Sequence, residues 1–229
     1  MKNIVLLGAT GSIGDSCLNV IRQNKKHFHL FGIGLGGNLD KAQQIAKEFS
    51  PKHIFVAESH IDKSHDLLKS YPNILNTEDE LQGLIQDPSV DIIISAISGF
   101  AGLKASYFAV DAGKTILIAN KESIVAAGDI LMPLAKTKNS EIIPVDSEHN
   151  ALYQCFPPHI DLKEISKIMI TASGGPFRKK TFKELSGVTL QDALKHPTWS
   201  MGTKITIDSA TLVNKCLELI EAHYLFQIP

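Results

Sequence analysis

The chain has 229 residues, of which 44% are hydrophobic and 21% are charged, so it can form a packed core and is not of the disordered class. Its 23 Lys and Arg nearly balance its 24 Asp and Glu, which excludes an overall charge bias toward nucleic acid or an anionic membrane. Three widely spaced cysteines predict neither a disulfide framework nor a zinc site, and no apolar run approaches the about 18 residues of a membrane span. We therefore expect a cytoplasmic protein with no membrane or nucleic-acid partner.

Six short apolar runs alternate with helical patterns over the first 150 residues. Each run is rich in Ile or Val, which is typical of strands buried on both faces of a sheet. Over 39–49 the apolar residues recur at helical spacing, and Asn38 stands where an N-cap belongs. This alternation predicts an α/β domain over 1–150, a Rossmann-like, doubly wound parallel sheet. The expected strands are 4–7, 28–33, 53–56, 92–96, 116–119 and 142–145.

The pattern changes after Pro157 and Pro158. Two short strands are expected over 165–172 and 204–207, followed by a helix over about 208–226. These elements predict a smaller α+β catalytic domain over 151–229. Because the chain stops directly after the helix, we expect this domain to be truncated at its carboxyl end. One stripe of the helix is marked by Leu212, Cys216, Leu219, Ile220 and His223.

A glycine-rich turn over 8–14 follows the first expected strand and opens the first helix. Glycines allow a tight turn and the close approach of a pyrophosphate to a helix N-terminus, so this context favours a dinucleotide site over an ordinary turn. NAD enzymes usually carry an acidic residue near the end of the second strand to bind the ribose 2′-hydroxyl. Here no acid occurs before Asp40, which the pattern places inside the next helix. This favours NADP, although the turn contains no Arg.

Carboxylates occur in two places that suit a metal ion. Asp146 and Glu148 end the sixth run, and in an extended chain residues i and i+2 point to the same side. Paired carboxylates without His or Cys suit Mg²⁺ or Mn²⁺, and a solvated acidic turn before a helix is the alternative. Asn214, Lys215 and Glu218 share one helix face. Asn214 and Lys215, with Ser209 at the helix start, would bind a phosphate, and Glu218 would complete the metal site. Alternatively, Lys215 and Glu218 form only a surface ion pair.

Three further segments carry polar groups at places that suit a ligand. Ser173 and two following glycines offer a hydroxyl and backbone N–H groups after an expected strand. His196 lies in a loop with Trp199, where it is either structural or part of a lid. The range 120–123 follows the fifth strand, at the edge where open α/β sheets bind ligands.

Seven segments together resemble the 1-deoxy-D-xylulose 5-phosphate reductoisomerase family, in the order in which they occur in that family. The segments are 8–14, 120–123, 146–151, 173–177, 196–202, 208–211 and 214–218. The chain departs from the family pattern at Cys216, where Gly is usual, which we expect to alter only local packing. Family members also continue into a C-terminal helical domain, which we expect to be missing here.

The resemblance implies an NADPH- and divalent-metal-dependent oxidoreductase and isomerase. It would convert 1-deoxy-D-xylulose 5-phosphate, a sugar phosphate, to 2-C-methyl-D-erythritol 4-phosphate in non-mevalonate isoprenoid biosynthesis. The implied metal ligands for Mg²⁺ or Mn²⁺ are Asp146, Glu148 and Glu218, and the implied catalytic groups are Lys121, Glu148 and His196. The implied substrate contacts are Lys121, Ser147, Glu148, Ser173, His196, Trp199, Ser209, Asn214, Lys215 and Glu218. The implied cofactor contacts are Thr10, Gly11, Ser12, Ile13, Gly36, Gly37, Asn38, Asn120, Glu122 and Gly202.

Two alternatives stay open from the sequence. Another NADP-linked dehydrogenase would not need three carboxylates, and truncation would leave an inactive cofactor-binding fragment. The final helix also carries more apolar surface than a short domain is expected to cover, at Leu219, Ile220, Tyr224, Leu225 and Phe226. We therefore expect self-association as a homo-oligomer, with a dimer as the simplest form, and NADPH binding with poor turnover.

Overall fold

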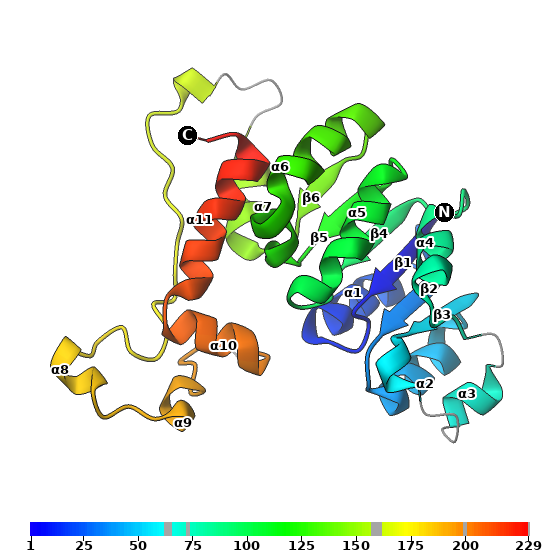
Figure 1. The fold of residues 1–229 in the computed structure, drawn as a ribbon, viewed down its shortest axis with the longest axis horizontal. Helices are drawn as coiled ribbons and strands as arrows, with labels where there is room; N and C mark the ends of the chain where they lie inside the picture. The colour runs from blue at the N-terminus through cyan, green and yellow to red at the C-terminus, as the bar shows by residue number, and fades with distance from the viewer. Residues whose placement is uncertain (62–65, 72–73, 157–161, 199–200, 229) are drawn as a thin grey trace. The chain divides into compact units, whose positions relative to one another are not determined.

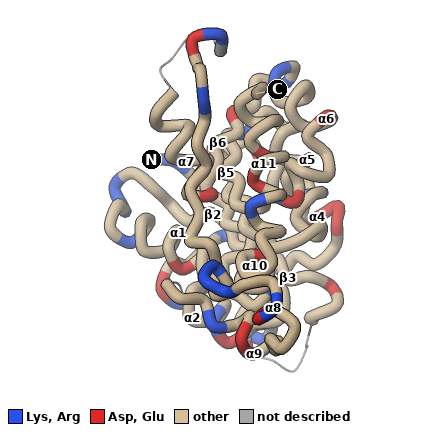
Figure 2. The backbone as a smooth tube through the Cα atoms, turned by 90° about the vertical axis from the view of Figure 1, so that its left-hand side faces the viewer, with Lys and Arg blue, Asp and Glu red and all other residues tan. Residues whose placement is uncertain are grey.

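A computed structural model of the chain describes residues 1–229 apart from 62–65, 72–73, 157–161, 199–200 and 229 (Figure 1). The chain divides into two compact units, Met1–Asp146 and Ser147–Pro229. Lys and Arg are interspersed with Asp and Glu along the backbone, in keeping with a net charge of −1 (Figure 2). Among the described residues, no helix combines the length and the apolar character that a membrane crossing requires.

The first unit is built on a six-stranded sheet with the order β3-β2-β1-β4-β5-β6. Every neighbouring pair of strands is parallel. The predicted doubly wound α/β sheet is therefore confirmed, and each expected run contains a strand whose ends lie within two residues of the predicted ones. The strands are β1 (Lys2–Leu7), β2 (Phe28–Leu35), β3 (His53–Val56), β4 (Ile92–Ser95), β5 (Thr115–Ile118) and β6 (Ile142–Pro144).

The core of the first unit lies between this sheet and its helices. Val5, Leu6 and Leu7 of the central strand β1 are fully buried, which explains why that run is continuously apolar. The helix α2 has its predicted bounds, and the Asn38 side chain accepts a hydrogen bond from the Lys41 backbone N–H at 3.2 Å. The helices are α1 (Ser12–Gln23), α2 (Leu39–Phe49), α3 (Asp66–Ser70), α4 (Glu78–Gln86), α5 (Leu103–Asp111) and α6 (Lys121–Lys138), with the short 3₁₀ turns η1 (Glu58–His60) and η2 (Phe100–Gly102).

The described part of the second unit consists of helices and irregular segments. The prediction of a strand over 165–172 is wrong, since no described strand pairs with this segment and satisfies its backbone groups. The prediction of a strand over 204–207 is also wrong, because the Thr206 N–H bonds to the Gly202 carbonyl oxygen at 3.1 Å and a helix forms instead. The elements are α7 (Ser147–Cys155), η3 (Leu162–Glu164), α8 (Phe182–Leu185), α9 (Leu190–Ala193), α10 (Thr203–Ala210) and α11 (Val213–Phe226).

The single helix expected over about 208–226 is two helices. Leu212 separates α10 from α11 with a φ of +62°, a left-handed conformation that breaks the helical hydrogen bonding. The apolar stripe predicted for this helix does not form its buried face, because Leu219 is 58% and Ile220 43% exposed. The buried face of α11 instead contains Glu218, Glu221, Ala222 and Phe226. The helix thus turns carboxylates inward and leaves apolar side chains exposed.

Candidate active site

The turn after β1 has glycines at positions where a side chain would not fit. Gly8 has a φ of +86°, and a Cβ atom built on it would lie 2.3 Å from the Ala96 carbonyl oxygen. A Cβ atom on Gly14, in the first turn of α1, would lie 2.3 Å from the Ala9 carbonyl oxygen. This turn lies at the point where the strand order reverses, and its geometry fits the pyrophosphate of a dinucleotide. The predicted contacts Thr10, Gly11, Ser12 and Ile13 lie in it.

The turn after β2 is linked to the β1 turn by one lysine. Lys41, in the first turn of α2, donates from Nζ to the Thr10 carbonyl oxygen at 3.1 Å and to Asp15 at 2.7 Å. Asp40 lies inside α2, as the sequence pattern indicated. The predicted cofactor contacts Gly36, Gly37 and Asn38 form the turn itself. The structure therefore brings the two predicted cofactor segments together at one edge of the sheet.

The ends of β5 and β6 place a third group of polar residues at the same edge of the first unit. Asn120 caps α6 by accepting from the Ser123 N–H at 2.8 Å, and its side-chain amide donates to Glu122 at 3.3 Å. Lys121 donates from Nζ to Asp146 Oδ2 at 2.7 Å, and the two side chains are only 8% and 12% exposed. Such a pair holds both charged groups in a fixed position, because neither has water as a ready alternative partner.

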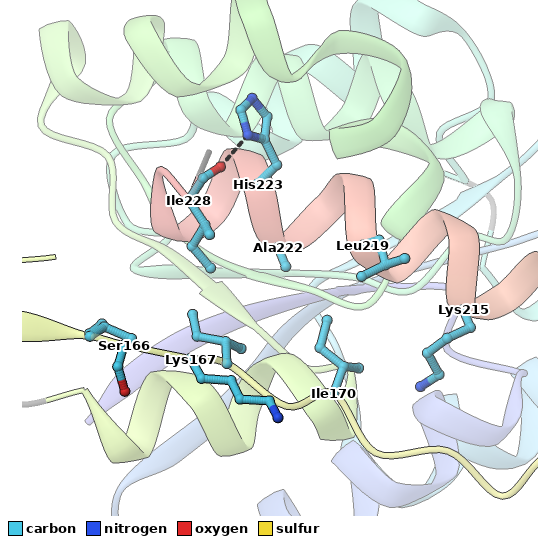
Figure 3. A pocket seen from close by; sticks show the side chains of 10 residues that line it. Ser166, Lys167, Ile170, Lys215, Leu219, Ala222, His223 and Ile228 are labelled. Atoms are coloured by element: carbon cyan, nitrogen blue, oxygen red, sulfur yellow. Dashed lines mark hydrogen bonds between the residues drawn. The ribbon is translucent and has the colours of Figure 1, made fainter. Parts of the chain in front are cut away.

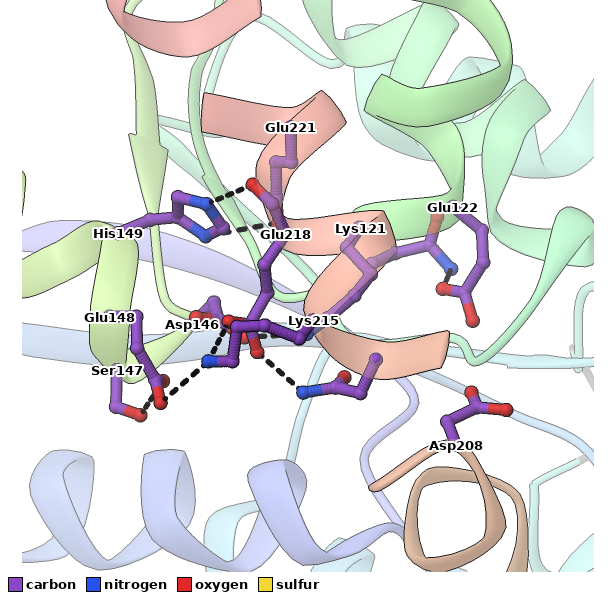
Figure 4. A network of polar contacts seen from close by, with 12 residues as sticks. Lys121, Glu122, Asp146, Ser147, Glu148, His149, Asp208, Lys215, Glu218 and Glu221 are labelled. Atoms are coloured by element: carbon purple, nitrogen blue, oxygen red, sulfur yellow. Dashed lines mark hydrogen bonds and ion pairs between the residues drawn. The ribbon is translucent and has the colours of Figure 1, made fainter. Parts of the chain in front are cut away.

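In the second unit, one lysine joins the carboxylates of α7 and α11 (Figure 4). Lys215 Nζ lies 3.3 Å from Glu148 Oε1 and also donates to Glu218 and to the Thr171 carbonyl oxygen. Asn214 donates from its side-chain amide to Glu218 at 2.5 Å. The Glu218 side chain is 1% exposed, so its contact with Lys215 is not the surface ion pair that the sequence left open.

A buried histidine, which was not among the predicted site residues, holds the same two helices together. His149 Nε2 lies 2.9 Å from the Glu218 carbonyl oxygen, and its Nδ1 lies 3.1 Å from Glu221 Oε2 (Figure 4). His149 and Glu221 are 0% and 1% exposed, and the His149 ring stacks on Phe226. The signal was present in the sequence, since His149 directly follows Glu148 and Glu221 stands three residues after Glu218. A polar residue between apolar neighbours, as Glu221 is between Ile220 and Ala222, needs a partner where it is buried.

The turn after segment 165–172 lies beside the end of α10. Ser173 Oγ lies 3.0 Å from His196 Nε2, so the structure brings together two residues predicted from separate segments. Gly175 has a φ of +65°, and a Cβ atom on it would lie 2.6 Å from the Ser209 carbonyl oxygen. With Lys215 bonded to the Thr171 carbonyl oxygen, this turn, α10 and α11 form one polar surface of the second unit.

The start of α7 differs from the sequence prediction. The extended geometry expected for Asp146 and Glu148 is wrong, because α7 begins at Ser147 and Glu148 lies in its first turn. The Cα atoms of the two residues still lie within about 7 Å of each other, which is the most that two peptide links can span. Ser147 donates to Glu148 at 2.6 Å, and Gly202 is the N-cap residue of α10. Trp199 lies outside the described residues.

A cavity of about 530 Å³ opens between segment 165–170 and α11 (Figure 3). Lys215 lies at one end of it and Ile228 at the other. The walls between them are mainly apolar and include Ile170, Leu219 and Ala222. Lys215 carries its charge at the end near Glu148 and Glu218, and Lys167 adds a second charged group to the lining.

Comparison with known proteins relates both units to one family. A family model described as 1-deoxy-D-xylulose 5-phosphate reductoisomerase matches residues 4–128, and a model of that enzyme's C-terminal domain matches residues 142–226. The chain is 46% identical to the 1-deoxy-D-xylulose 5-phosphate reductoisomerase of Geobacillus sp. (strain WCH70), over 100% of this chain and 60% of that protein. It is 47% identical to the enzyme of the same name from Francisella tularensis subsp. novicida (strain U112), over 98% of this chain and 59% of that protein.

Solved structures give the same relationship. A crystal structure of DOX-P reductoisomerase in complex with NADPH, fosmidomycin and magnesium matches with a TM-score of 0.92 and 40% identity, over 100% of this chain and 59% of that chain. The Zymomonas mobilis enzyme in complex with NADPH matches with a TM-score of 0.87, also at 40% identity. The chain thus spans about 60% of the length of the relatives that it matches.

Proposed function

Because the chain belongs to the 1-deoxy-D-xylulose 5-phosphate reductoisomerase family, we propose that it supplies the NADPH, metal and substrate sites for converting 1-deoxy-D-xylulose 5-phosphate to 2-C-methyl-D-erythritol 4-phosphate. The observation that carries this proposal is the convergence of Glu148, Lys215 and Glu218 in the second unit. A dehydrogenase that only transfers hydride needs no such carboxylate set, which argues against the wider class of NADP-linked dehydrogenases.

The first unit would bind NADPH. The bare glycine turn at the switch point fits the pyrophosphate, and the turn after β2 would receive the adenosine end. Asn120 and Glu122, which follow β5, would contact the cofactor from the other side of the switch point, and Gly202 would supply a further contact. The absence of an acid in 34–38 removes the repulsion that a 2′-phosphate would meet.

Asp146, Glu148 and Glu218 would hold Mg²⁺ or Mn²⁺. Carboxylate oxygens are the ligands that these hard cations prefer, and the donor set contains no soft ligand. Glu148 and Glu218 both lie within hydrogen-bond range of Lys215 Nζ. The second unit therefore brings two of the three carboxylates together around the Lys215 ammonium group. Asp146 is kept near Glu148 by its position two residues earlier in the chain. His149 would position Glu218 through its contact with the backbone of α11.

Ser173, Ser209, Asn214 and Lys215 would bind the substrate, chiefly its phosphate. Hydroxyl, amide and ammonium donors on one polar surface are the groups that bind a phosphate. His196 would orient the Ser173 hydroxyl through their 3.0 Å contact. Ser147 and Lys121 would contact the remaining substrate oxygens.

The two bound groups would supply the chemistry that side chains do not. NADPH supplies a hydride, and the divalent ion supplies positive charge next to the substrate oxygens. The residues of the chain orient the substrate and fix its phosphate, so that binding energy remote from the reacting carbons contributes to catalysis. Lys121, Glu148 and His196 are the side chains that we assign to proton handling and orientation at the reacting end.

Calorimetric titration of the purified chain with 1-deoxy-D-xylulose 5-phosphate tests this function. We expect substrate binding that requires Mg²⁺ or Mn²⁺ and that Lys215→Ala weakens, whereas NADPH should bind with or without the metal. Exposed Lys183→Ala, on α8 of the same unit, is the matched control. NADPH oxidation is followed in parallel, and we expect slow turnover. Metal-independent substrate binding, or none with metal present, would contradict the proposal.

We also propose that the chain forms a homo-oligomer, most simply a dimer, with α11 at or near the contact. Leu219 and Ile220 are exposed side by side on α11, and such apolar surface is costly to leave in water. Light scattering should give a mass above the 25.0 kDa of one chain. Leu219→Lys with Ile220→Lys should lower it, and a parent chain that stays monomeric would show that this surface needs no cover.

A further inference from the structure

The turn that would receive the adenosine end of NADPH is covered by a histidine from the neighbouring strand connection. β2 ends at Leu35 and β3 at Val56, and the two strands are paired in the sheet. The Ala57 N–H bonds to the Leu35 carbonyl oxygen at 3.0 Å, and the His60 N–H bonds to the Ala57 carbonyl oxygen at 2.8 Å. These bonds fold η1 back toward the end of β2, so that His60 reaches the turn at residues 36–38.

The His60 imidazole lies against the two glycines of that turn. A Cβ atom built on Gly37 would lie 3.1 Å from His60 Nδ1, and one on Gly36 would lie 3.5 Å from His60 Cδ2 and 3.7 Å from Nε2. Side chains at these two positions would therefore compete with the ring for space. The glycines leave room for an imidazole that is exposed to solvent and has both nitrogens near the turn backbone.

Among the described residues, Lys41 is a second basic group next to this turn, and it is already engaged. Lys41, in the first turn of α2, donates to the Thr10 carbonyl oxygen and to Asp15. The turn itself contains no Lys or Arg. A 2′-phosphate placed here would thus meet turn N–H groups and the His60 ring, without the arginine that commonly accommodates it in dinucleotide-binding folds.

We infer that His60 contacts the 2′-phosphate of NADPH and contributes to the preference of this chain for NADPH over NADH. An imidazole N–H donates a hydrogen bond to a phosphate oxygen, and such a charge-assisted bond is stronger than one between neutral groups. NADH lacks the phosphate, so the contact distinguishes the two cofactors. This inference rests on the proposed NADPH site and deepens it by naming a specificity-determining residue.

Fluorescence titrations with NADPH and NADH test the inference on the whole chain. We expect the parent to prefer NADPH by about tenfold or more, and His60→Ala to lose most of that preference by weakening NADPH binding about tenfold, with little change for NADH. His60→Arg should keep the preference, because its guanidinium also donates to phosphate. His27→Ala is the control, since His27 is also exposed but precedes β2, at the opposite end of that strand.

The outcomes separate this inference from the function on which it rests. If His60→Ala keeps the parental ratio of affinities, or weakens NADPH and NADH equally because the ring only stacks on the adenosine, the inference is wrong and the NADPH site stands. If the parent binds both cofactors equally, the NADPH assignment fails together with it. Circular dichroism of each variant shows whether a change in affinity reflects unfolding.

Discussion

The two units of this chain differ in the proportion of polar side chains that they bury. In Met1–Asp146 the buried groups are mostly aliphatic, such as Leu6, Ile33 and Ile93, each fully buried in the sheet. Among the described residues of Ser147–Pro229, the buried apolar side chains are Ala210, Ala222 and Phe226. The buried polar side chains there are His149, Thr206, Glu218 and Glu221.

This difference is the one expected between a unit that serves as a scaffold and a unit that carries reactive side chains. The first unit gains its stability from an apolar core, so it can position a cofactor with backbone turns at the edge of a sheet. The second unit buries carboxylates, which cost free energy to desolvate unless they are paired. A sequence that places charged groups inside and leaves Leu219 and Ile220 exposed does so at the expense of stability, which is the pattern expected of a functional surface.

The largest effect should come from breaking the buried pair in the second unit. His149→Leu removes the partner of the Glu221 carboxylate, so we expect a loss of about 3–5 kcal/mol in the free energy of unfolding. The double variant His149→Leu, Glu221→Leu should recover much of it, because the Glu221 carboxylate that lost its partner is then removed as well. Urea unfolding of the two single variants and the double variant forms the cycle, and additive losses would show that the pair does not interact.

A slightly smaller effect should come from the core of the first unit. Leu6→Ala removes a fully buried side chain from β1, and we expect a loss of about 2–5 kcal/mol in the free energy of unfolding. Leu219→Ala, at a position 58% exposed, should change it by less than about 0.5 kcal/mol. Equal losses for the two variants would contradict the contrast between the units, since Leu219 would then be buried in solution.

The smallest effect concerns the surface of the first unit and its pH dependence. Backbone N–H bonds from Asn76 and Thr77 lower the pKa of Glu80, which forms a capping box at the start of α4. A lowered pKa means that ionised Glu80 stabilises the fold above its ordinary pKa of about 4.3. That contribution is lost as the pH falls through the lower folded-state value.

Glu80→Gln measures this contribution. Because Glu80 is exposed and screened by solvent, we expect the variant to lose only about 0.5 kcal/mol at pH 7 and nothing near pH 3. Unfolding at both pH values, with Asp79→Asn in the same helical turn as the control, provides the check. A loss that stays constant between pH 7 and pH 3 would show that the carboxylate charge is not involved.

The first unit was largely predictable from the sequence, and the second was not. Strands buried on both faces leave continuous apolar runs, so 53–56 and the helix over 39–49 were predicted with the bounds of β3 and α2. Segments 165–172 and 204–207 also look like strands, but such patterns are realised only where a partner strand is available. Leu212 likewise carries no sequence signal for the left-handed conformation that separates α10 from α11.

The candidate site was also predictable from the sequence only in part. The grouping of Asn214, Lys215 and Glu218 followed from helical spacing, because residues three and four apart share a face. The contacts of Lys215 with Glu148 and of Ser173 with His196 depend on tertiary folding, and no spacing in the sequence indicates them. The buried pair of His149 and Glu221 was missed because each residue alone looks like an ordinary polar residue of a helix.

Titration of the chain with Mn²⁺, followed by the electron paramagnetic resonance of the free ion, tests the central claim that this chain holds a divalent metal with Glu218 as one of the ligands. We predict that the parent binds Mn²⁺ and that Glu218→Gln weakens binding by at least about tenfold to a hundredfold, while NADPH affinity stays unchanged. Glu164→Gln, an exposed carboxylate of the same unit, should bind Mn²⁺ like the parent. Parental Mn²⁺ affinity in Glu218→Gln would contradict the account.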